Sequence, residues 1–96
     1  MILEMAVLNV KPGTAPAFEN ALRNARRLIE ASDGFQKMEV RPCLETQNRY
    51  LLLVWWESVD AHNIGFRQSE RYEEWRIALH QYYAPFPIVE HFAAPL

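Results

Sequence analysis

The sequence predicts an α+β fold of the ferredoxin-like type, in which helices cover one face of an antiparallel sheet and the element order is β-α-β-β-α-β. Three observations support this prediction: an uncharged run at residues 50–56, two segments whose apolar side chains recur at helical spacing, and shorter apolar segments that flank them as strands. The chain has 96 residues without an internal repeat or linker, so residues 1–96 are expected to form a single domain.

The first strand and the first helix are defined by their patterns and by the residues that end them. Residues 1–10 are mostly apolar, with Glu4 and Asn9 as interruptions, and a Lys-Pro-Gly turn follows. Thr14 is placed to cap a helix with one apolar stripe. Gly34 is expected to end this helix, because glycine adopts a positive φ without strain.

The next two strands are expected to pair as a hairpin. Residues 35–44 alternate, with Phe35 on one face and Met38 on the other. Pro42 indicates an edge position or a bulge in this strand, because proline donates no hydrogen bond to a neighbouring strand. A polar connection then leads to the run at 50–56.

The second half of the chain predicts an interrupted helix and a last strand. Ser58 is expected to cap a short helix over residues 59–66, and Ser69 to restart the helix. A second apolar stripe follows at offsets of three and four residues: Tyr72, Trp75, Leu79 and Tyr82. An Ala-Pro-Phe-Pro segment ends this helix, and residues 88–92 form the last short strand.

The strand at residues 50–56 is apolar on both of its sides. One side carries Tyr50, Leu52, Val54 and Trp56, and the other carries Leu51, Leu53 and Trp55. Helices can cover only one of these sides, so a second copy of the chain, packed sheet against sheet, is the simplest cover for the other. The sequence therefore predicts a homodimer, and alternation alone leaves open which side faces the partner.

Composition and charge exclude several classes of function. With a net charge of −2 and no apolar stretch as long as a membrane span, neither a nucleic-acid partner nor a membrane is expected. Cys43 is the only cysteine, and no leader-like segment is visible, so a reducing, cytoplasmic setting is expected. The three histidines do not have the spacing of a metal site, so no metal ion is expected.

One segment resembles a known family. It comprises Trp56-Glu57-Ser58, Asp60-Ala61-His62 and Phe66-Arg67-Gln68-Ser69-Glu70-Arg71-Tyr72. This segment, together with the order of the elements, is similar to small antibiotic-biosynthesis-monooxygenase domains, which are dimeric α/β-barrel proteins. The resemblance implies a homodimer with a pocket between the sheet and the second helical region of each subunit. Some members oxygenate polycyclic aromatic or quinol substrates with O2 and without metal or flavin, whereas others degrade haem.

The resemblance holds at some of the family's site positions and fails at others. His62 matches a frequent histidine of the family, but Arg71 stands where a second histidine often precedes the aromatic residue. The haem-degrading members use an asparagine, a tryptophan and a histidine, and the matching positions here are Ala6 or Val7, Phe66 and Arg76. Because a guanidinium does not replace imidazole as an iron ligand, haem degradation is not expected, although a shifted alignment would bring His80 near that position.

Two residues are the candidates for catalysis. His62 could remove a proton from a phenolic or quinol substrate and so produce an anion that donates an electron to O2. Alternatively, it could simply face solvent or bond a carbonyl. Arg67 could hold the anionic oxygen, or it could form an ion pair with Glu70 or Glu74. His80, at the end of the last helix, is expected to be structural, with an imidazolium favoured by the helix dipole.

The substrate pocket is expected to be formed by aromatic side chains and one histidine: Trp56, Phe66, Tyr72, Trp75 and His91. Packing in the core or the dimer interface is the alternative for the aromatic residues, and a buried, hydrogen-bonded histidine is the alternative for His91. The leading hypothesis is a cofactor-independent monooxygenase that acts on an aromatic, quinol or polyketide-like small molecule. The alternative is a non-catalytic homodimer of the same fold that binds a small apolar molecule or is purely structural.

Overall fold

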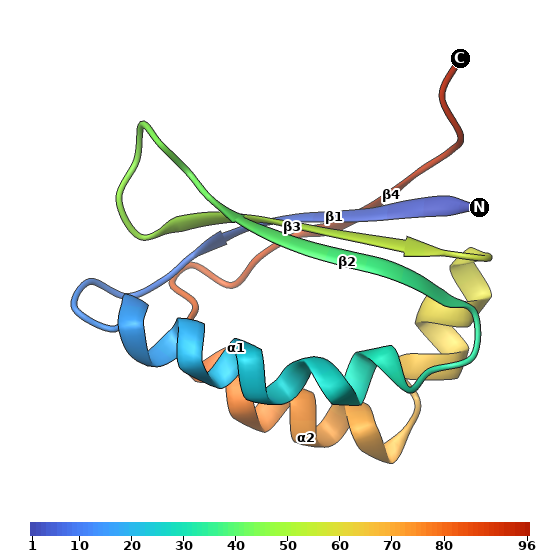
Figure 1. The fold of residues 1–96 in the computed structure, drawn as a ribbon, viewed down its shortest axis with the longest axis horizontal. Helices are drawn as coiled ribbons and strands as arrows, with labels where there is room; N and C mark the ends of the chain where they lie inside the picture. The colour runs from blue at the N-terminus through green and yellow to red at the C-terminus, as the bar shows by residue number, and fades with distance from the viewer.

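The computed structural model describes all residues from Met1 to Leu96 and has the predicted α+β, ferredoxin-like architecture (Figure 1). Its elements are β1 (Ile2–Asn9), α1 (Ala15–Glu30), β2 (Phe35–Pro42), β3 (Arg49–Trp56), the π-helix η1 (Ala61–Phe66), α2 (Glu70–Leu79), the 3₁₀ turn η2 (His80–Tyr82) and β4 (Val89–Phe92). The strands pair antiparallel in the order β2-β3-β1-β4. Figure 1 shows α1 and α2 together on one face of this sheet, while the other face is bare.

The structure determines which side of β3 faces the helices. Tyr50, Leu52, Val54 and Trp56 are buried beneath the helices, and Val54 and Trp56 have no exposed surface. Leu51, Leu53 and Trp55 point to the bare face and stay partly exposed. The first set therefore belongs to the core of the subunit, together with the apolar stripe of α1.

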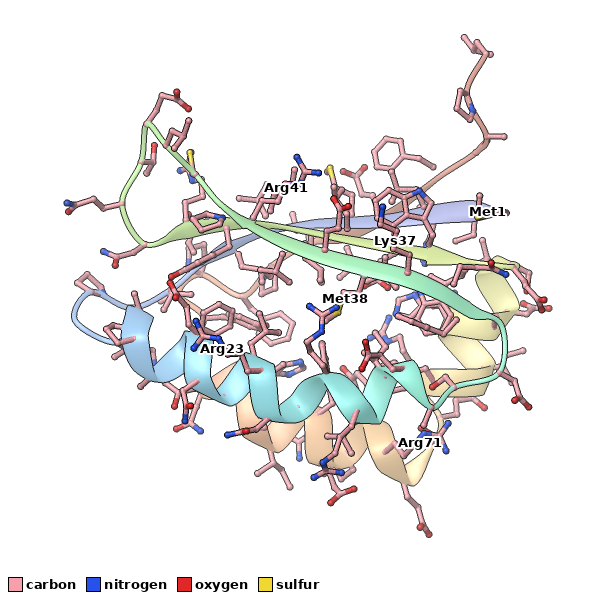
Figure 2. The ribbon with its side chains drawn as sticks, viewed as in Figure 1. Met1, Arg23, Lys37, Met38, Arg41 and Arg71 are labelled. Atoms are coloured by element: carbon pink, nitrogen blue, oxygen red, sulfur yellow. The ribbon has the colours of Figure 1, made fainter.

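The second strand departs from simple alternation at its start. A bulge between Phe35 and Lys37 changes the register with β3, so Phe35 packs on the core and its ring lies 5.8 Å from that of Trp56. The prediction that Phe35 faces away from Met38 is therefore wrong. Beyond the bulge the alternation holds: Met38 points toward the helices, while Lys37 and Arg41 lie on the bare face (Figure 2). Pro42 lies on an edge strand, as predicted.

The ends of the helices are only partly as predicted. Ser69 caps α2, because its Oγ accepts a hydrogen bond from the backbone N–H of Tyr72 at 3.2 Å. Thr14 stands at the N-cap position of α1 but makes no side-chain cap; its hydroxyl donates to the carbonyl of Lys11 at 2.6 Å. Gly34 has a φ of +82°, and a Cβ added there would lie 2.7 Å from the Cβ of Ala61. Glycine thus allows the turn after α1 to approach the start of η1 closely.

Two further properties concern the helices and the single cysteine. None of its helices combines the length and the apolar character that crossing a bilayer requires. Cys43 is a free thiol at the end of β2 and is half-buried.

Candidate active site

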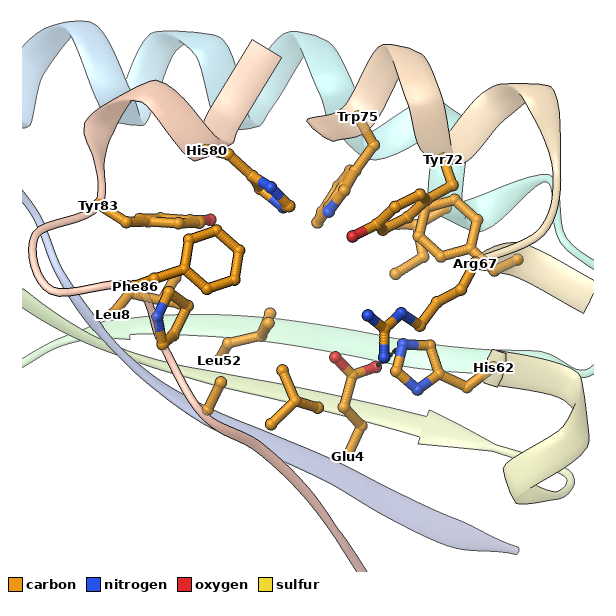
Figure 3. Close-up of a pocket in the computed structure, with 15 residues that line it drawn as sticks. Glu4, Leu8, Leu52, His62, Arg67, Tyr72, Trp75, His80, Tyr83 and Phe86 are labelled. Atoms are coloured by element: carbon orange, nitrogen blue, oxygen red, sulfur yellow. Dashed lines mark ion pairs between the residues drawn. The ribbon is translucent and has the colours of Figure 1, made fainter. Parts of the chain in front are cut away.

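A small cavity lies between the sheet and the second helical region (Figure 3). Its floor comes from the central strands and includes Glu4 and Leu8 of β1 and Leu52 of β3. Its roof and far wall are aromatic: Phe66, Tyr72, Trp75, Tyr83 and Phe86. The space available to a ligand is about 70 Å³.

The structure brings most of the predicted site residues to this cavity. His62, Phe66, Arg67, Tyr72 and Trp75 line it. Trp56 and His91 do not line it and instead lie behind His62. The indole of Trp56 stacks on the His62 ring at 5.3 Å and on the Phe66 ring at 6.1 Å, whereas His91 contacts His62 from the edge strand β4.

Glu4 is a site residue that was not predicted. Its side chain is 4 % exposed, and its Oε1 accepts a hydrogen bond from the indole N–H of Trp56 at 2.9 Å. The Nε2 atom of His62 lies 3.3 Å from the same oxygen. The register explains this position, because Glu4 pairs with Val54 of β3 and His91 of β4 and so shares their face of the sheet. The signal in the sequence was a lone carboxylate within an apolar strand.

Burial moves the pKa values of this pair in opposite directions. Desolvation raises the pKa of Glu4 to about 7, although the Trp56 hydrogen bond and the charge of Arg67 oppose the rise. Desolvation also lowers the pKa of His62 to about 4, and the neighbouring His91 and Arg67 add to the decrease. The short distance alone would suggest an ion pair, but burial favours an uncharged carboxyl and an uncharged imidazole. Near neutral pH it is therefore Glu4, and not His62, that gains or loses a proton.

The local backbone explains how His62 comes to face inward. The short helix predicted at residues 59–66 is a π-helix over most of its length, and it buries His62 and Phe66 on the side facing the sheet. Ser58 accepts a hydrogen bond from the N–H of Ala61 at 3.1 Å, which supports its predicted capping role. π-Helical turns are frequent at functional sites, where they redirect side chains. The alternative in which His62 points into solvent is therefore wrong.

Arg67 lies at the rim of the cavity. It forms no ion pair with any carboxylate, so the predicted alternative of a pair with Glu70 or Glu74 does not occur. Its guanidinium lies 5.8 Å from the centre of the Tyr72 ring, and Figure 3 shows it directed toward Glu4 and the cavity. The charge of Arg67 is thus available to an anion in the cavity.

Two other basic residues behave differently from the expectations. His80 lines the far wall, with its ring 4.9 Å from that of Phe86, and burial followed by the charges of Arg76 and Arg67 lowers its pKa. The expectation of an imidazolium favoured by the helix dipole is therefore wrong. Arg71 points away from the site and donates to the carbonyl of Leu28 and to the hydroxyl of Ser32, both at 3.2 Å. Arg71 therefore provides a hydrogen-bond donor for a backbone carbonyl in the last turn of α1. It does not take the place of the second histidine that many family members have in the site.

No three His, Cys, Asp or Glu side chains are arranged so that they could hold a metal ion. The side chains in the cavity that can take part in a reaction are one carboxyl, imidazole rings, phenols and one guanidinium. A carboxyl with a near-neutral pKa can accept a proton from a weakly acidic ligand, and the guanidinium can stabilise the resulting oxyanion.

Comparisons with known proteins agree with this geometry. The family model of antibiotic biosynthesis monooxygenases matches residues 1–77. The chain is 44% identical over 92 residues to YczJ of Bacillus subtilis (strain 168), itself uncharacterized, with 96% of this chain and 97% of YczJ covered.

Solved structures show the same fold. An antibiotic-biosynthesis-monooxygenase-type protein from Bordetella bronchiseptica is 36% identical, with a TM-score of 0.93 over 99% of this chain and 97% of its own. SnoaB, a cofactor-independent oxygenase from Streptomyces nogalater, is 18% identical, with a TM-score of 0.83 over 99% of this chain and 93% of its own. The last likeness shows the fold alone. The family match over most of the length, together with the cavity between sheet and second helix, shows that this chain belongs to the antibiotic biosynthesis monooxygenase family.

Proposed function

We propose that this chain is a cofactor-independent monooxygenase that acts on an aromatic, quinol or polyketide-like small molecule. The observation that supports this most directly is the convergence of Glu4, His62 and Arg67 on one cavity with aromatic walls. SnoaB, which shares the fold, is described as a cofactor-independent oxygenase.

In this reaction the Glu4–His62 pair is the base, and Arg67 stabilises the substrate anion. Glu4 is the stronger proton acceptor of the two, because its pKa is about 7 whereas that of His62 is about 4. Removal of a proton from an activated substrate carbon leaves an anion whose charge is shared with a phenolic oxygen, which Arg67 can stabilise. This anion donates an electron to O2, and the two radicals combine to a peroxide. The peroxide takes back the proton that the base removed and then loses water, so a methylene and O2 give a carbonyl and water.

The small size of the cavity is the reason to keep a second candidate, a non-catalytic homodimer of the same fold that binds a small molecule or is purely structural. The space of about 70 Å³ is well below the roughly 300–1,000 Å³ of most ligand pockets. A polycyclic substrate can enter only if part of the wall moves. Phe86 is suited to this, because it is 62 % exposed and belongs to the irregular segment before β4.

Oxygen consumption with a panel of anthrones, quinols and naphthols separates the two candidates. The wild type is expected to consume O2 with at least one of them, and Arg67→Ala is expected to lower kcat/KM by about tenfold or more, because the oxyanion loses its counter-charge. Arg76→Ala is the matched control, since Arg76 is exposed and pairs only with Glu73. Tight binding without oxygen consumption would support the binding protein, and equal rates in both variants would remove Arg67 from the mechanism.

We further propose that the protein is a homodimer in which the bare faces of two sheets pack together, and that it works in the reducing cytoplasm, as the free Cys43 suggests. The bare face is apolar at its centre and carries Leu3, Met5 and Val7 of β1 beside Leu51, Leu53 and Trp55 of β3. Charged residues, Lys37, Glu39 and Arg41, occupy its edge on β2 and pair with one another. An apolar centre with a polar rim is typical of protein interfaces.

A charge at the centre of this face should prevent association. Leu53→Asp is expected to shift the mass in light scattering from about twice 11.3 kDa to the monomer value, because an aspartate would be buried without a partner. Ile77→Asp, on the exposed side of α2, is the control and should leave the mass unchanged. A wild type that is monomeric at micromolar concentration would contradict the proposed dimer.

A further inference from the structure

We propose that His91 is the outer end of a proton path that connects the buried Glu4 carboxyl to solvent through the imidazole of His62. The use of this path in catalysis rests on the proposed function. The path itself is a property of three side chains and can be tested without any substrate.

The three groups form a continuous row, with a hydrogen bond between the two imidazoles and a close contact between His62 and Glu4. His62 Nε2 lies 3.3 Å from Glu4 Oε1, and His62 Nδ1 lies 2.8 Å from His91 Nε2. Each group comes from a different element, β1, η1 and β4, and Glu4 and His91 are paired residues on adjacent strands. The Trp56 indole stacks on the His62 ring with an interplanar angle of 23°, so the ring is held with one nitrogen toward each neighbour.

The row leads from the interior to the outside. Glu4 and His62 are each 4 % exposed and line the cavity. His91 does not line the cavity, and it is partly exposed on the edge strand β4. A proton can therefore leave Glu4 by a way that does not cross the cavity and stays open when a ligand fills it.

Two protonation states of the row differ by a single proton. When Glu4 is ionised, His62 carries its proton on Nε2, the nitrogen next to Glu4 Oε1, and His91 Nε2–H donates to His62 Nδ1. When Glu4 is protonated, His62 Nε2 is free to accept that proton, His62 Nδ1–H donates to His91 Nε2, and His91 carries its proton on Nδ1. The first state holds two protons on the three groups and the second holds three. The third proton enters or leaves at His91 Nδ1, the nitrogen that faces away from His62.

Burial and the surrounding charges keep His62 uncharged. Desolvation, followed by the charges of His91 and Arg67, lowers the pKa of His62. The other titratable groups in the cavity wall are Tyr72, His80 and Tyr83, and Glu90 lies exposed on the opposite side of β4. None of them is an alternative carboxylate next to the ring. His62 is therefore neutral in both states and can pass a proton between Glu4 and His91.

A pH jump followed by time-resolved infrared spectroscopy tests the path on the intact protein. The carbonyl stretch of protonated Glu4, identified by its absence in Glu4→Gln, reports when the proton arrives or leaves. His91→Gln keeps a donor for His62 Nδ1 but cannot relay a proton, and His91→Ala leaves room for added imidazole. Both variants are expected to slow the relaxation by roughly 10²-fold, the scale of a lost proton-transfer group. Imidazole should restore the rate in His91→Ala only, and Glu90→Gln should relax like the wild type.

The outcomes separate this inference from the proposed function. Unchanged relaxation in both His91 variants would overturn the proton path, and so would slow relaxation in His91→Ala that imidazole fails to restore. If the relaxation behaves as expected while no substrate consumes O2, the path stands and the oxygenase proposal falls. If O2 is consumed but the relaxation is unchanged, the oxygenase proposal stands without the path.

Discussion

Glu4→Gln is expected to lower the rate of substrate-dependent oxygen consumption by about 10²-fold or more, because the amide cannot accept the substrate proton. Glutamine has the shape of glutamate and can still accept the hydrogen bond from Trp56, so the fold should be retained. The wild-type rate should rise with pH around a midpoint near 7, the pKa of Glu4, as the carboxyl ionises. The variant should lose this midpoint, which initial rates measured between pH 5 and 9 would show.

The matched control is Glu74→Gln, an exposed position on α2 that makes no ion pair. It should keep both the rate and the pH midpoint of the wild type. If Glu4→Gln also kept both, Glu4 would not be the base, and the pair would have to act through His62 alone.

Stability is expected to depend on pH in opposite directions at Glu4 and His62. Burial raises the pKa of Glu4 from 4.5 to about 7, so its contribution to stability is present below pH 4.5 and is lost as the pH rises through 7. Burial lowers the pKa of His62 from 6.5 to about 4, so its contribution is present above pH 6.5 and is lost as the pH falls through 4. Each shift corresponds to about 3 kcal/mol, so the two effects nearly cancel between these limits in the wild type.

Single variants should reveal each effect. In Glu4→Gln only His62 remains, so the free energy of unfolding should rise by about 3 kcal/mol from pH 4 to 6.5. In His62→Phe only Glu4 remains, so the free energy of unfolding should fall by about 3 kcal/mol from pH 4.5 to 7. Urea unfolding at a series of pH values measures both profiles, with Glu74→Gln as the reference. Two variant profiles that slope in the same direction would contradict the opposed pKa shifts.

Much of the fold follows from local patterns, and the exceptions have physical causes. The stripe of α1 and the edge position of Pro42 could be predicted because they depend on neighbouring residues. The face of Phe35 could not, since no residue type marks the bulge that redirects it. The alternating pattern could not show whether Leu52 or Leu53 faces the helices, because both sides of β3 are apolar. Only packing against the helices distinguishes the two sides.

The site was predictable where one segment forms it. His62 and Arg67 were identified from the resemblance of their segment and from their side-chain chemistry, and η1 and the following turn place both at the cavity. Glu4 was missed, and His91 was assigned to the pocket wall although it lies behind His62. Their positions depend on β1 pairing between β3 and β4, which joins residues almost ninety positions apart. Such long-range register is not visible in one sequence.

Trp56 has a consequence for how this protein can change over evolution. Its indole donates to Glu4, stacks on His62 and Phe66, and has no exposed surface. A substitution there would disturb the proton-handling pair and the hydrophobic core together, so that position should be strongly constrained. Phe86 lines the cavity from its exposed rim and is not part of the proton-handling pair or of the buried core. New ligand preferences should therefore arise by changes at the rim, over an interior that stays the same.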